Sequence, residues 1–250
     1  MIIAIGNRKG GTGKTTTVVN IGRALAMKGK RVLLIDLDPQ ANLSYSFGIS
    51  TEGCLLGEAL LENDIDSGSI YYKNGIDIIP STNELQEYET EFIREQYNIN
   101  ILKKTLDSVK EHYDFILIDC PPAASFLTKS ALVACDTVLI PMLMDALSLQ
   151  GFEQMVELVS DIKDRFNSKL WVIGVLGVIV DERRHLTRDI LSVVKNNYGI
   201  DVFENYIRQN VKAAEAPAHG KSVLDYAPKS NSAKDYISVV DELLTNVSEN

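Results

Sequence analysis

The stretch Lys9-Gly10-Gly11-Thr12-Gly13-Lys14-Thr15-Thr16 follows an apolar run at residues 2–6 and leads into a helical pattern at about residues 14–28. Glycines have no Cβ, so the backbone of such a turn can bring several N–H groups close to phosphate oxygens. The N-terminus of the helix adds partial positive charge. A strand, a glycine-rich turn and a helix in this order therefore predict a phosphate-binding loop.

Two residues of this loop have specific expected roles. Lys14 is placed to reach the outer phosphates of a nucleotide, and the Thr15 hydroxyl can ligate Mg²⁺. The strict pattern G-x-x-x-x-G-K-[ST] is not met, because Arg8 stands where its first glycine would be. The rest of the predicted cradle consists of Gly10, Gly11, Thr12, Gly13 and Thr16.

The remainder of the chain alternates between strand-like and helical runs. Strands are expected at residues 2–6, 31–36, 76–79, 115–119, 137–141 and 170–180, and helices at about 14–28, 100–112, 125–134, 150–166, 186–198 and 233–246. Such alternation predicts an α/β fold with a doubly wound, mostly parallel sheet and helices on both faces. We expect one domain over residues 1–250, in which residues 43–100 are the least readable part.

Three aspartates are expected near the loop. Asp36 and Asp38 end one predicted strand, and Asp119 ends another before Cys120. Ligands of open α/β sheets bind at the carboxyl ends of the strands, and carboxylates there can serve Mg²⁺ directly or through water. Each aspartate alone could equally be a turn or cap residue. Their occurrence together with the loop favours a nucleotide and metal site.

Composition limits the classes of function. The formal net charge is −9, yet the stretch from residue 183 to 234 carries a net charge of +4, which allows a basic face on an acidic protein. The three cysteines are far apart, so they indicate neither a disulfide framework nor a metal-cluster carrier. The longest apolar run, residues 170–180, is too short to cross a bilayer. We therefore expect a cytoplasmic protein.

Several motifs together resemble the ParA/Soj group of deviant P-loop ATPases, which partition chromosomes and plasmids. They are K-G-G-x-G-K-T-T at 9–16, V-L-L-I-D-x-D-P-Q at 32–40, the segment ending at Asp119, and N-V-K with E-A-P-A-H-G-K-S at 210–222. The resemblance implies a Mg²⁺-dependent ATP hydrolase with a P-loop NTPase fold, slow without its partner. It also implies that Lys9 crosses a dimer interface to the partner's ATP, that Asp38 orients the attacking water, and that Thr15, Asp36 and Asp119 serve Mg²⁺.

The chain departs from the family pattern at a few positions. Arg208-Gln209-Asn210 replaces the usual P-R-N in a segment that runs beside the adenine in relatives. The resemblance therefore implies that Asn210 and Val211 lie near the base. The chain starts at the strand before the loop, so we expect no N-terminal helix-turn-helix extension.

Relatives of this type bind nonspecific DNA as ATP dimers and are stimulated by a ParB-like centromere-binding protein, which implies a nucleoid-associated location. Phosphate contacts by basic residues give binding that ignores sequence and falls with salt. The candidates are Arg183, Arg184, Arg188, Lys195, Arg208, Lys212, Lys221 and Lys234. Three alternatives remain: an ATPase that positions a protein assembly, a P-loop biosynthetic enzyme, and a MinD-like membrane ATPase. The last is disfavoured because residues 233–250 carry a net charge of −3, which anionic lipid would repel.

Overall fold

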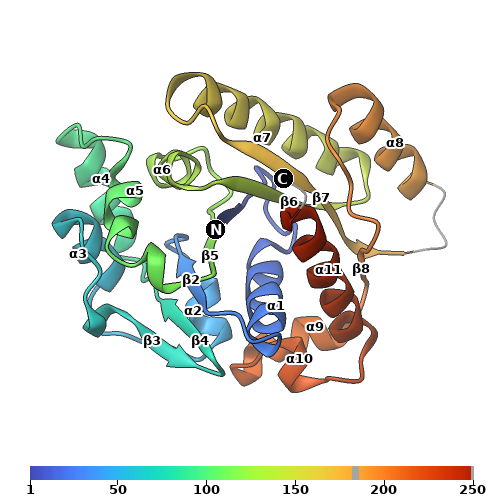
Figure 1. Ribbon diagram of the computed structural model, residues 1–250, viewed down its shortest axis with the longest axis horizontal. Coiled ribbons are helices and arrows are strands. Elements are labelled where there is room, and N and C mark those ends of the chain that lie inside the picture. Colours follow the sequence, from blue (N-terminus) through green and yellow to red (C-terminus); the bar gives the residue numbers. More distant parts are fainter. Residues whose placement is uncertain (182–185, 249–250) are drawn as a thin grey trace.

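The computed structural model describes residues 1–181 and 186–248 (Figure 1). Its strands form one sheet in the order β3-β4-β2-β5-β1-β6-β7-β8, and of the described pairs only β3 with β4 is antiparallel. The strands are β1 (Ile2–Ile5), β2 (Val32–Asp36), β3 (Tyr71–Lys73), β4 (Ile76–Ile79), β5 (Phe115–Asp119), β6 (Thr137–Leu143), β7 (Trp171–Val180) and β8 (Ile207–Arg208). The expected α/β fold with a mostly parallel sheet is confirmed.

Helices cover both faces of the sheet (Figure 1). One face packs on α1 (Lys14–Met27), α2 (Asn42–Ser46), α9 (Val211–Glu215), α10 (Val223–Tyr226) and α11 (Asn231–Ser248). The other face packs on α3 (Leu55–Glu62), α4 (Leu85–Arg94), α5 (Ile101–Asp107), α6 (Phe126–Ala134), α7 (Ala146–Arg165) and α8 (Leu186–Tyr198). The central strands β2 and β5 are buried along their whole length, which explains their uninterrupted apolar sequence.

Two helices differ from the expected ranges. The expected helix at 100–112 consists of α5 and a separate 3₁₀ turn, Lys110–His112. Helix α7 begins at Ala146 and not near residue 150, because Asp145 caps it by accepting a hydrogen bond from the backbone N–H of Ser148. This earlier start brings Asp145 and Ser148 into the candidate site.

Residues 43–100 contain elements that the sequence did not predict. They include α2, α3, α4 and the strand β3, which joins β4 through Asn74 and Gly75. Both turn residues have positive φ, 53° and 80°, as an Asn-Gly hairpin turn requires. The hairpin was therefore readable from this dipeptide, although β3 itself has only three residues.

The last helix, α11, packs along α1 (Figure 1). Its residues Tyr236, Val239, Val240 and Leu243 are buried in the same core as Val18 and Ile21 of α1. The apolar face of α11 is thus used inside the protein. In the part of the chain that the structure describes, no helix combines the length and apolar character of a membrane span.

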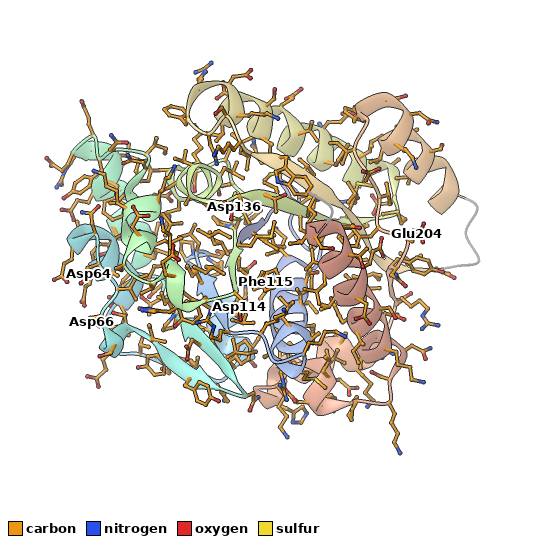
Figure 2. All side chains as sticks on the ribbon, in the orientation of Figure 1. Asp64, Asp66, Asp114, Phe115, Asp136 and Glu204 are labelled. Atoms are coloured by element: carbon orange, nitrogen blue, oxygen red, sulfur yellow. The ribbon has the colours of Figure 1, made fainter. Side chains whose placement is uncertain are left out.

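Aspartates at the amino ends of the strands have structural partners. Asp114 accepts hydrogen bonds from the guanidinium and backbone N–H of Arg31, which lowers the pKa of this carboxyl to about 2. Asp136 accepts a hydrogen bond of 2.7 Å from the backbone N–H of Ile2. Both residues are labelled in Figure 2. The carboxylates at the opposite ends of the strands have different surroundings.

Candidate functional site

The glycine-rich loop lies between β1 and α1, at the carboxyl end of the sheet. Gly11 and Gly13 have φ of +74° and +70°, a conformation that side chains with a Cβ rarely adopt. The buried Asn7 holds the start of the loop, since its Nδ2 donates to the Pro141 carbonyl at 2.8 Å and its Oδ1 accepts from the Lys9 N–H at 2.9 Å. Asn7 therefore fixes the backbone at the start of the loop.

Lys14 is the first residue of α1 and is almost fully buried. Its Nζ donates to the Lys9 carbonyl across the loop at 3.3 Å. Burial lowers the pKa of Lys14, and the charge of Asp119 opposes this shift. A phosphate would be a much stronger acceptor for this ammonium than the carbonyl that it now contacts.

Asp119 and Asp36 are paired in register at the ends of β5 and β2. Both carboxylate oxygens of Asp119 are buried and have no hydrogen-bond partner, and the Thr15 hydroxyl nearby lies outside ordinary hydrogen-bond geometry. Burial raises the pKa of Asp119 well above its usual value, and the charge of Asp36 raises it further. An unpaired buried carboxylate is costly, so Asp119 requires a ligand or a proton.

Asp36 is fully buried too, but it is held by hydrogen bonds. Its Oδ2 accepts from the Ser44 N–H at 2.8 Å and from the Ser44 hydroxyl at 2.7 Å, and the same hydroxyl accepts from the Ser81 N–H at 2.9 Å. Burial is the main cause that raises the pKa of Asp36 to about 6. Asp36 thus joins the end of β2 to α2 and to the segment after β4.

The two aspartates that were expected to bind Mg²⁺ differ in their hydrogen bonding. Asp119, with Thr15 beside it, fits a hard cation because its oxygens have no other partner. Asp36 is already bound by Ser44 and could act on a cation only together with that serine. Within residues 1–181 and 186–248 no three metal-binding side chains form a closed site, so a cation would take further oxygens from phosphate or water, as Mg²⁺ commonly does.

Asp38 lies in the loop between β2 and α2 and is 9% exposed. Its Oδ1 accepts from the Gln40 N–H at 3.0 Å, which leaves Oδ2 for another partner. Its charge acts on Lys14, so the two side chains lie in the same site. The structure therefore brings Lys14, Asp36, Asp38 and Asp119 together, as the sequence predicted.

Lys9 is bound within its own subunit. Its Nζ donates to Asp145 Oδ1 at 3.2 Å and to Ser148 Oγ at 3.0 Å, both at the N-terminus of α7. Gly151 permits this close packing, because a Cβ there would lie 2.8 Å from Asn7 Oδ1 and 2.8 Å from Lys9 Cβ. For Lys9 to reach a second subunit, it must leave these partners.

Next to the loop is a pocket of about 320 Å³. Gly13 and Thr16 line one side, and the rest of its wall comes from the end of β7, from β8 and the segment that joins it to α9, from α9, and from Tyr236 of α11. Asn210 and Val211, the residues expected near the base, are both part of this wall. The volume lies at the lower end of the range for ligand pockets, which suits one part of a nucleotide.

The basic residues proposed for DNA have unequal surroundings. Arg183 and Arg184 lie outside the described residues, and Arg188 belongs to α8 without a described side chain. Lys195, Lys221 and Lys234 are exposed. Two others are paired within the protein: Arg208 binds the buried Asp235, with an Nη2–Oδ1 distance of 2.5 Å, and Lys212 binds Glu215 at 2.8 Å.

Sequence reasoning missed Ser44, Asp145 and Ser148. The pattern D-x-x-S at residues 145–148 is a helix-capping signal, and it could have located the start of α7. Nothing local in the sequence connects these residues with Lys9, which is 136 residues away from Asp145. Their importance follows only from the packing of α7 on the loop.

The chain is similar in sequence to known proteins along almost its whole length. Residues 1–172 match the family described as an AAA domain. The chain is 39% identical over 249 residues to the sporulation initiation inhibitor protein Soj of Bacillus subtilis, which covers 98% of both chains. It is 34% identical over 242 residues to the chromosome-partitioning ATPase Soj of Treponema pallidum, covering 95% of this chain and 94% of the other.

A solved structure is similar over nearly the same length. The crystal structure of cobyrinic acid a,c-diamide synthase from Mycobacterium smegmatis, with bound ATP analog and magnesium, has a TM-score of 0.86 and 30% sequence identity. The alignment covers 99% of this chain and 95% of that one. The similarities in sequence and in structure thus extend beyond the loop to the pocket and α11.

Proposed function

Because the chain belongs to the Soj/ParA family of chromosome-partitioning ATPases, we propose that it couples ATP hydrolysis to a cycle of dimerisation and DNA binding. As a member of this family, the chain is an ATP hydrolase with a role in partition, and it uses ATP and Mg²⁺. The observation that carries the proposal is the arrangement around one loop of a lysine for phosphates, an unpaired carboxylate and a pocket for the base.

The roles of single residues follow from their surroundings. Lys14 exchanges the Lys9 carbonyl for phosphate oxygens, and the loop N–H groups share that charge. Thr15 and Asp119 hold Mg²⁺, which neutralises phosphate charge when it is bound. Asp38 orients the attacking water through its second carboxylate oxygen, and Asp36 keeps the loop after β2 in place.

Dimerisation depends on Lys9 in this proposal. The ammonium leaves Asp145 and Ser148 and reaches the ATP of the partner subunit, so that hydrolysis requires two subunits. When the outer phosphate is lost, the Lys9 ammonium loses its phosphate contact in the partner subunit. It then returns to Asp145 and Ser148 at the N-terminus of α7. The exchange costs little, because the ion pair with Asp145 is partly exposed to solvent.

In this proposal, exposed lysines bind DNA. This binding keeps the ATP dimer on the nucleoid. Lys195, Lys221 and Lys234 have exposed side chains that can contact phosphates. Arg208 and Lys212 contribute less, because each is already paired with a carboxylate. A ParB-like centromere-binding protein is the proposed stimulator of hydrolysis and release.

The experiment is a fluorescence titration with duplexes of unrelated sequence in ATP and in ADP. We expect much tighter binding in ATP, equal affinity for all sequences, and a fall of log K by roughly 0.9 per contacted phosphate per log unit of salt. Equal binding in ATP and ADP would refute the nucleotide switch. No binding in either state at low salt would refute the DNA role.

Variants locate the DNA surface. The double change Lys221→Glu with Lys234→Glu should weaken DNA binding and leave ATP affinity unchanged, because both side chains are exposed. The matched control is Lys103→Glu with Lys104→Glu, which places the same charge on α5, on the opposite face of the sheet. If both double variants lost DNA affinity to a similar extent, DNA binding would depend only on the net charge of the protein and not on this surface.

A biosynthetic function is the second candidate, supported by the likeness to the synthase structure. An enzyme of that kind would turn over ATP with a small substrate and without DNA or protein activators. A partition ATPase should turn over slowly until DNA and its partner are added. A role in positioning a protein assembly would share the DNA cycle, and the stimulating partner would differ. A membrane role would need a surface other than the apolar face of α11, which packs on α1.

A further inference from the structure

Ser44, on α2, lies where three segments of the chain meet, and it is 2% exposed. Its hydroxyl donates to Asp36 Oδ2 at 2.7 Å and accepts from the Ser81 N–H at 2.9 Å. Its backbone N–H donates to the same Asp36 oxygen at 2.8 Å. One buried side chain therefore joins the end of β2, the helix α2 and the segment after β4.

The turn between β2 and α2 contains Asp38 and a residue in an unfavourable conformation. The Ala41 N–H donates to the Asp38 carbonyl at 2.9 Å, and the Gln40 N–H donates to Asp38 Oδ1 at 3.0 Å. Ala41 has a φ of +53°, a left-handed conformation that costs free energy for a residue with a Cβ. Such a conformation persists when the surrounding structure requires it, and conformations of this kind cluster at functional sites.

Asp36 holds this turn at both ends. Its Oδ1 accepts from the Asp38 N–H at 3.4 Å, and its Oδ2 accepts from Ser44, which follows Ala41 by three residues. Removal of the Ser44 hydroxyl would take one donor from Asp36 Oδ2 and would break the bond to the N–H of the buried Ser81. The carboxylate of Asp36 would then be less firmly oriented, and the turn with Asp38 would be less firmly held.

We propose that Ser44 is a positioning residue for ATP hydrolysis, an inference that rests on the function proposed above and deepens it. In this proposal Ser44 contacts neither ATP nor the attacking water. It fixes Asp36, and Asp36 fixes the turn from which Asp38 orients the water. A small displacement of Asp38 slows an attack that needs exact alignment, whereas phosphate binding by Lys14 and the loop does not depend on it. The signature of this role is slower hydrolysis at unchanged ATP affinity.

The test measures binding and chemistry separately in wild type and Ser44→Ala. Calorimetric titration with a non-hydrolysable ATP analog and Mg²⁺ gives the affinity. Single-turnover hydrolysis, with protein in excess over ATP, gives the rate of the chemical step. We expect this rate to fall about tenfold in Ser44→Ala and the affinity for the analog to change by less than about twofold.

Two further variants separate positioning from general support of the fold. Ser46→Ala is the matched control, because it removes another buried hydroxyl of α2, one that donates to the Asn42 carbonyl at 2.7 Å. Each alanine variant should unfold at a lower urea concentration than wild type, but only Ser44→Ala should hydrolyse ATP slowly. Ser44→Thr keeps a hydroxyl at this position and should recover most of the rate.

The outcomes that contradict the proposal are distinct. A wild-type rate in Ser44→Ala would overturn the positioning role, and so would an equal loss of rate in Ser46→Ala. A loss of analog affinity as large as the loss of rate in Ser44→Ala would also overturn it, because Ser44 would then act on binding. A wild type that neither binds the analog nor hydrolyses ATP would overturn the proposed function itself.

Discussion

Asp119 and Asp36 are neighbours of the same residue type, but their hydrogen bonds give them different chemistry. Asp119 has two unpaired oxygens, and Asp36 is bound twice by Ser44. The sequence gives both the same position at the end of an apolar strand. Their difference comes from Ser44, which is eight residues from Asp36 and buried only after α2 has folded.

Lys14→Ala and Asp119→Ala should therefore fail in different ways. Lys14→Ala removes the buried ammonium that faces phosphate, so nucleotide should be lost with or without Mg²⁺. Asp119→Ala should bind ATP with nearly normal affinity in the absence of Mg²⁺. It should lose the increase in ATP affinity that Mg²⁺ gives in wild type. Calorimetric titration with and without the ion measures both, with the exposed Lys30→Ala as control. Normal ATP affinity in Lys14→Ala would refute the site.

The pKa of Asp36 predicts a pH effect on stability in the absence of Mg²⁺. Burial raises this pKa to about 6, whereas the carboxyl of an unfolded chain has a pKa near 3.8. The folded state then binds the proton more tightly, so Asp36 stabilises the fold below about pH 4, and the contribution is lost as the pH rises through 6. Two pKa units correspond to at most about 3 kcal/mol.

The variant Asp36→Asn removes this titration and keeps an acceptor for Ser44. Urea unfolding at about pH 4 and pH 7 should show that wild type loses up to about 3 kcal/mol more than the variant over this interval. Titration of carboxyls away from Asp36 cancels in the comparison, because both proteins contain them. Asp119 changes the difference in the same direction, because the charge of Asp36 raises its pKa in wild type alone. The same pH dependence in both proteins would contradict the raised pKa.

At the scale of elements, the N-terminus of α7 controls Lys9. Asp145→Asn should keep the helix cap, since asparagine caps as well as aspartate, while it removes the charge that holds the ammonium. We expect a larger dimer fraction at low ATP, by a few fold, measured by light scattering. Asp161→Asn on the same helix removes a partner of Arg165 and should change nothing. An unchanged dimer fraction in Asp145→Asn would show that the contact with α7 does not restrain Lys9.

Most of the strands and helices could be predicted, and the reasons for the failures are physical. Long apolar runs such as 115–119 were readable because central strands are buried on both sides. Helix α4 was not, because only Leu85 and Phe92 of its ten residues are buried and its other side chains are mostly polar. The carboxylates and the loop followed from local sequence, whereas the partners of Lys9 and the bond between Ser44 and Ser81 depend on packing between distant segments.

At the scale of the whole molecule, Gly10 tests the dimer. It is not among the glycines with positive φ, and a Cβ there would meet no atom of the subunit within 4 Å. Gly10→Val should therefore unfold like wild type and yet remain monomeric in ATP and Mg²⁺, since its Cβ position is open in the single subunit and lies in the loop that faces the ligand and, in the proposed dimer, the second subunit. Gly11→Val is the contrasting variant, because its φ of +74° predicts a loss of about 1–3 kcal/mol in the monomer. A full ATP dimer of Gly10→Val would refute the face-to-face arrangement.

The packing of α11 on α1 has a consequence for how the protein is made. Ribosomes deliver β1 and α1 first, but β1 needs β5 and β6 as neighbours, and α1 needs Tyr236 and Leu243 of the last helix. The helix that follows the phosphate-binding loop is therefore covered only after the residues of α11, far along the chain, have been synthesised. A truncated product that lacks α11 leaves the apolar side of α1 uncovered, and it is a substrate for chaperones and proteases before it can become an ATPase.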